Sequence, residues 1–128
     1  LVAAPPGPVS CAVAAPSSRF THLVADFVGV PAAQLGDSAL VGGLLVAAAG
    51  AAGLAPHGAP VLRTLPHAGV AGLFLLDGCH IAVHTFPGEE LLLLDVLARA
   101  SHDAQRAVDV FARRLSARAV HTAQRGRG

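Results

Sequence analysis

Four strand-like apolar runs follow one another in the middle of the chain, and they constrain the fold more than any other feature. They span about residues 59–65, 70–76, 79–85 and 91–98. The short connections between them are rich in Pro, Gly and Asp, which are turn-forming residues. Successive strands joined by such short turns run antiparallel. The sequence therefore predicts an antiparallel sheet.

Two helices are expected around these runs. The first begins at a cap formed by Asp37-Ser38 and continues to about residue 52. The second begins at Ser101 and ends near residue 116, with its apolar residues along one stripe. One further strand-like run precedes the first helix, at about 21–29, and another follows the second helix, at about 118–123. This order predicts an α+β fold, a two-layer protomer with helices on one face of an antiparallel sheet.

The composition bears on assembly and partners. Hydrophobic residues make up 53% of the chain and charged residues only 13%, which is more apolar surface than a small monomer easily buries. We therefore expect a homodimer that pairs the uncovered sheet faces into an αββα sandwich. The formal net charge is +1, without a focused basic face, so a nucleic-acid partner is not expected.

No membrane association is expected either. No apolar run reaches the ~18–20 residues of a membrane span without a Gly, Pro or charged residue. Cys11 and Cys79 are too few for a disulfide framework, and a cytoplasmic location is expected. We divide the chain into a Pro/Ala-rich tail (1–18), one domain (19–124) and a Gly/Arg tail (125–128).

The chemistry-bearing groups concentrate in residues 77–87, where a thiol and two imidazoles precede a Phe-Pro-Gly turn. His80 and His84 are four residues apart, about 13 Å along a strand, so one metal ion cannot bind both and no metal site is expected. Strand alternation places both histidines on one face and Cys79 on the other. A Cys79–His84 dyad would need a bulge. The remaining histidines are expected on the surface or in loops: His22, His57, His67, His102 and His121.

Residues 78–88 resemble the self-cleavage segment of the bacterial, pyruvoyl-dependent S-adenosylmethionine decarboxylase proenzymes, roughly Glu-Ser-His-x-x-x-His-Thr-Trp-Pro-Glu. Three further segments resemble family motifs in the same order. They are His22-Leu23-Val24-Ala25-Asp26-Phe27, Gly69-Val70-Ala71-Gly72 and Asp95-Val96-Leu97-Ala98-Arg99. The resemblance implies the two-layer protomer and the αββα dimer already expected.

The resemblance also implies a site. In the family, the peptide bond before the Ser is broken by an N→O acyl shift, and that Ser becomes the pyruvoyl group. The equivalent bond here joins Gly78 and Cys79. The catalytic residues implied are Cys79, His84 and Asp26. The ligand-binding residues are expected to be Arg99, Phe27, Phe86 and His80.

This chain departs from the family pattern at chemical positions. Cys79 replaces the processing Ser, Ala71 the Ser that assists cleavage, and Gly88 the Glu after Trp-Pro. Arg99 replaces the proton-donating Cys, and a guanidinium does not act as an acid. We therefore expect an uncleaved chain without an ordinary pyruvoyl group or other cofactor. Cys79 is then either a buried structural residue or a thiol in new chemistry, unless it undergoes an N→S acyl shift.

Three functions remain open. The first is a diverged enzyme that acts on a small molecule in the family pocket, although the reaction cannot be read from the residues. The second is a pyruvoyl-dependent decarboxylase of S-adenosylmethionine or a basic amino acid in polyamine biosynthesis, with pyruvoyl formed from Cys79. The third is an inactive paralogue that regulates an active partner as a heterodimer. Arg99 either pairs with Asp26 or Asp95 or anchors a ligand anion. We predict that it faces the pocket near His84.

Overall fold

Six strands form one antiparallel sheet in the computed structural model, which describes residues 18–128. The strands are β1 (Phe20–Val28), β2 (Val61–Thr64), β3 (Val70–Leu76), β4 (Cys79–Phe86), β5 (Leu91–Arg99) and β6 (Ala119–Arg127). The helices are α1 (Ala32–Leu35), α2 (Ser38–Ala51), α3 (Gln105–Arg114) and the 3₁₀ helix η2 (Pro87–Glu89). The strand order is β2-β3-β4-β5-β1-β6, with every neighbouring pair antiparallel. The predicted α+β fold is confirmed.

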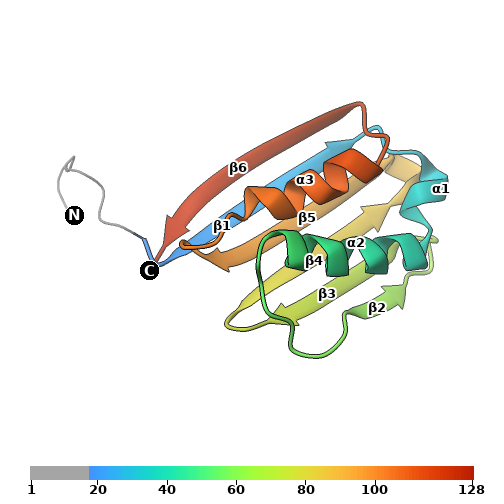
Figure 1. Ribbon diagram of the computed structural model, residues 1–128. Coiled ribbons are helices and arrows are strands. Elements are labelled where there is room, and N and C mark those ends of the chain that lie inside the picture. The colour runs from blue at the N-terminus through green and yellow to red at the C-terminus, as the bar shows by residue number, and fades with distance from the viewer. Residues whose placement is uncertain (1–17) are drawn as a thin grey trace, which may run out of the picture.

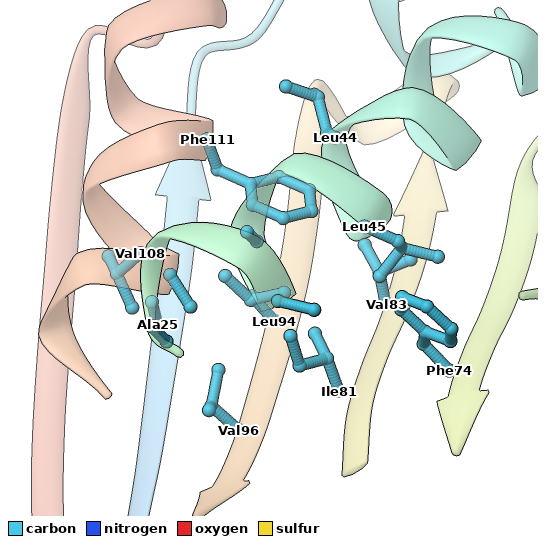
Figure 2. Close-up of a cluster of buried hydrophobic side chains, with 14 of the residues drawn as sticks. Ala25, Leu44, Leu45, Phe74, Ile81, Val83, Leu94, Val96, Val108 and Phe111 are labelled. Carbon is cyan, nitrogen blue, oxygen red and sulfur yellow. The ribbon is translucent and has the colours of Figure 1, made fainter. Parts of the chain in front are cut away.

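The helices cover one face of the sheet. Figure 1 shows α2 and α3 lying across the same side of the strands. Between the layers, Leu45 of α2 and Phe111 of α3 point toward the sheet, where Val83 and Leu94 lie below them (Figure 2). We call the other side of the sheet, which no helix of residues 18–128 covers, the open face. No helix in residues 18–128 has the length and hydrophobicity that a membrane span requires.

The start and packing of α2 follow from its sequence. The Asp37 carboxylate accepts a hydrogen bond from the Leu40 amide at 3.0 Å, as an N-cap residue does. Gly42 lies where a Cβ atom would come within 2.7 Å of the Leu62 side chain on β2. Gly43, in contrast, faces open space. The helix therefore needs one of its two central glycines for close packing on the sheet.

Thr85 links the end of β4 to α1 and β3 through hydrogen bonds. It is fully buried, and its hydroxyl donates to the Leu35 carbonyl of α1 at 2.7 Å. The same oxygen accepts a hydrogen bond from the Val70 amide at 2.8 Å. One side chain thus satisfies two main-chain groups and joins α1, β3 and β4.

Two boundaries differ from the sequence predictions, and two short helices were not predicted. Ser101 does not begin α3. The helix starts at Gln105, and the Asp103 carboxylate accepts a hydrogen bond from the Gln105 amide at 3.1 Å. Residues 125–127 are not a tail but the end of β6, because Arg127 pairs with Phe20 and the backbone is hydrogen-bonded along β1. The short helices α1 and η2 were not predicted, and Cys11 lies outside the described residues.

Candidate functional site

Strand register brings His84 and Asp26 to the same part of the open face. His84 of β4 and Asp26 of β1 both pair with Leu93 of β5, one from each side. Their Cα atoms are therefore two strand spacings apart, about 10 Å. Both residues line a shallow hollow of about 300 Å³, whose other walls are largely apolar. Its remaining lining residues are Val24, Ala82, Leu93, Leu94 and Asp95.

A second polar group adjoins this hollow. The Nε2 atom of His22 lies 2.7 Å from the Asp95 carboxylate, and Nε2 of His80 lies 3.8 Å from the same oxygen. The His22 side chain is only 29% exposed, so the prediction of an ordinary surface histidine is wrong. The signal that could have identified it is the pairing of β1 with β5, because His22 pairs with Leu97, two residues beyond Asp95.

Cys79 faces away from this group. Its side chain is 7% exposed and belongs to the hydrophobic core on the helix side of the sheet. It pairs with Leu76 across a two-residue turn, Asp77-Gly78, in which Gly78 has a φ of +70°. His84, five residues further on, points to the open face. Cys79 and His84, two of the three residues that the resemblance implies to be catalytic, therefore lie on opposite faces, as strand alternation predicted in the absence of a bulge.

Phe27 does not line the open face. The expectation that it binds a ligand is wrong, because its side chain is fully buried and its ring lies 6.2 Å from that of Phe111 in the core. Phe86 is half-buried at the end of β4, on the same face as His84. Its ring stacks on His67 with the centroids 5.9 Å apart, so the loop before β3 covers this end of the open face.

Arg99 lies on the open face but not beside His84. Its side chain is exposed, and its guanidinium sits 4.8 Å above the Phe20 ring. Leu93, the partner of His84, is six residues away along β5, or about 20 Å. The prediction that Arg99 faces the pocket near His84 is therefore wrong. The physical reason is that Arg99 is the last residue of β5, where the sheet ends in solvent.

A metal site does not emerge from this arrangement. In the part of the chain that the structure describes, no three His, Cys, Asp or Glu side chains are placed to hold an ion. His80 and His84 point from the same strand toward different neighbours, Leu97 and Leu93. The chemical groups on the open face are thus imidazoles, carboxylates and guanidiniums.

The fold and the open-face site define a two-layer α+β protomer of the type described above, and comparisons with known proteins identify the family. The family model for S-adenosylmethionine decarboxylase matches residues 21–128. The crystal structure of the adenosylmethionine decarboxylase from Aquifex aeolicus VF5 is similar, with a TM-score of 0.79 and 27% sequence identity, covering 88% of this chain and 93% of that one. No curated protein sequence gives a significant match. The chain belongs to the S-adenosylmethionine decarboxylase family.

Proposed function

We propose that this chain is a diverged member of the family that acts on a small molecule at the open face, stays uncleaved and carries no ordinary pyruvoyl group. The position of Cys79 carries the proposal. Pyruvoyl formation begins with attack of the side chain on the preceding carbonyl, and a base must take the proton from the nucleophile. The Cys79 thiol lies in the core on the helix side, whereas His84 and Asp26 face the open side.

The other positions that would assist cleavage do not compensate. Ala71, which pairs with His84, has no hydroxyl to polarise a scissile bond. Arg99 cannot donate a proton at neutral pH. The residues present therefore do not fit the formation of a pyruvoyl group, and no step of the proposed activity depends on one.

The hollow beside His84 and Asp26 is the proposed ligand site. A largely apolar surface with a few converging polar groups is typical of small-molecule sites. His84 is suited to accept or donate a proton from a bound ligand, and Asp26 to bind a cationic or hydroxyl group. His80 and Phe86 lie on the same face at either side of His84 along β4, where they extend the binding surface.

Dimerisation would enclose this site. The open face exposes large hydrophobic side chains on four strands, and these are Val24, Val61, Leu73, Leu75 and Leu93. We propose that two copies stack through this face as an αββα sandwich. Arg99 and His84 lie at opposite ends of the face, so a two-fold axis that crosses the strands would place the Arg99 end of one protomer over the His84 end of the other. A complete site would then contain side chains from both protomers.

Intact mass spectrometry of the purified chain tests the absence of cleavage. We expect the wild type to give one full-length species with unmodified Cys79. A Cys79→Ala variant, which cannot be processed, should also give one full-length species. Two fragments that meet between Gly78 and Cys79 in the wild type alone would refute the proposal. Such fragments would favour the pyruvoyl-dependent decarboxylase, whose release of carbon dioxide from S-adenosylmethionine or arginine a carbonyl reagent would abolish.

Calorimetric titration tests the ligand site, with S-adenosylmethionine and arginine as the first probes. His84→Ala and Asp26→Asn should weaken binding of a probe that occupies the hollow. The matched control is His102→Ala, an exposed histidine on the loop before α3. Equal loss of binding in the control and in both site variants would refute the assignment of the hollow.

The exposure of Arg99 and the separation of Cys79 from His84 favour one second candidate, an inactive regulatory paralogue. Such a protein would use its open face to bind an active family member rather than to perform chemistry. Copurification of an active decarboxylase with this chain, together with activation of that enzyme, would support the second candidate. A homodimer that binds a probe in the absence of any such enzyme would support the first.

A further inference from the structure

Three arginines gather at one end of the open face. Phe20, in β1, pairs with Arg99 of β5 on one side and with Arg127 of β6 on the other. Arg125 pairs with His22, two residues along β1 from Phe20, and faces the same way. We call Arg99, Arg125 and Arg127 the arginine end. The sequence did not suggest this group, because Arg99 is 26 positions from Arg125 and only the strand order β5-β1-β6 brings them together.

Two of the three side chains, those of Arg99 and Arg127, lie beside the Phe20 ring. The Arg99 guanidinium lies 4.8 Å above the Phe20 ring, which holds it in place. Arg127 and Phe20 line a hollow of about 280 Å³ together with Gly78, Leu97 and Gly128. The backbones of Arg99 and Arg127 are two strand spacings apart, about 10 Å. Two long arginine side chains can therefore reach one small group between them.

No carboxylate among residues 18–128 forms an ion pair with the arginine end. The ion pairs among residues 18–128 use the carboxylates of Asp77, Asp95 and Asp103, and none includes an arginine of this group. Asp95, on the open face of β5, is hydrogen-bonded to His22, and Asp77, beside Gly78, lies 3.8 Å from His57. The three like charges, one on β5 and two on β6 with β1 between these strands, repel one another, so an anion bound between them would be favoured.

We propose that the arginine end binds the carboxylate or phosphate group of a small-molecule ligand. Guanidinium groups match both anions through paired hydrogen bonds, and Arg99 is already oriented by its contact with Phe20. This inference rests on the proposed function, because it assumes that the open face is a ligand site. It adds the chemical class of the ligand: a small molecule with an anionic group at the arginine end.

Calorimetric titration with pyrophosphate and with citrate, at ionic strength held constant with sodium chloride, tests the proposal. Tighter binding of pyrophosphate would indicate a phosphate group, and tighter binding of citrate a carboxylate. The test variant is Arg99→Gln/Arg127→Gln. The control is Arg113→Gln/Arg114→Gln, which removes the same charge from the exposed end of α3. We expect the control to bind like the wild type and the test variant to bind at least roughly tenfold more weakly.

Two results would overturn the proposal. One is equal weakening in both variants, which would reduce the effect to net charge. The other is a wild type that binds neither anion. If the test variant then also loses its dimeric state in sedimentation, these arginines pair with carboxylates of the second protomer instead. Intact mass, measured on the same sample, separates this inference from the proposed function. A single uncleaved chain that binds no anion refutes only the anion site, and a cleaved chain that binds one refutes only the uncleaved state.

Discussion

Replacing Thr85 by Val should destabilise the fold far more than its small chemical change suggests. The substitution keeps the side-chain shape and exchanges the hydroxyl for a methyl group. It leaves the Leu35 carbonyl and the Val70 amide, both bonded to that hydroxyl, without their side-chain partner. Each buried unsatisfied group costs about 1–3 kcal/mol. Burial of the added methyl offsets about 0.8 kcal/mol. We therefore expect the free energy of unfolding to fall by about 1–5 kcal/mol.

Urea denaturation followed by far-ultraviolet circular dichroism at fixed protein concentration measures this loss. Thr122→Val on the exposed strand β6 is the matched control and should stay within about 0.5 kcal/mol of the wild type. Thr85→Ser, which keeps the hydroxyl, should lose only the contribution of a methyl group, about 1 kcal/mol. If Thr85→Val unfolds at the same urea concentration as Thr122→Val, with an unchanged slope, Thr85 does not hold α1 and β3 to β4.

Three further predictions concern the core, the turn and the open face. Phe27→Ala should lower the free energy of unfolding by about 3–5 kcal/mol, because the Phe27 ring packs against Phe111 in the core. Chemical denaturation measures this loss, and a much smaller loss would mean that the ring is not a core contact. Gly78→Ala should cost about 1 kcal/mol because φ is +70°, whereas Gly88→Ala, also in open space but without a positive φ, should be near neutral in the same experiment. Leu73→Asp on the open face should convert a dimer to monomers in sedimentation, while Val46→Asp on the outer side of α2 should not.

The layer arrangement could be predicted from the sequence because it depends on local patterns. Turn residues such as Asp77-Gly78 fix which strands are neighbours, and the cap at Asp37 fixes where α2 begins. Alternation along β4 also predicted correctly that Cys79 and His84 would face opposite sides. Each of these inferences needs only a few consecutive residues, within which backbone geometry is repetitive.

The site could be predicted only in part, because its residues meet through register between strands distant in sequence. Phe27 follows Asp26 directly, so assigning both to a pocket overlooked that neighbours on a strand face opposite sides. The His22–Asp95 bond and the arginine end both depend on the insertion of β1 between β5 and β6. No local pattern in the sequence specifies that long-range pairing.

The register of β4 also explains why the Cys79 thiol does not belong to the open face. A slip of one residue would turn Cys79 outward, but it would turn the whole strand with it. Ile81 and Val83 would leave the core, at a cost of about 1.5–3 kcal/mol each, and His84 would enter it. Thr85 would lose both of its hydrogen bonds. The core side chains and Thr85 thus hold the thiol on the helix side. Any ligand chemistry on the open face must therefore use the imidazoles, carboxylates and guanidiniums there.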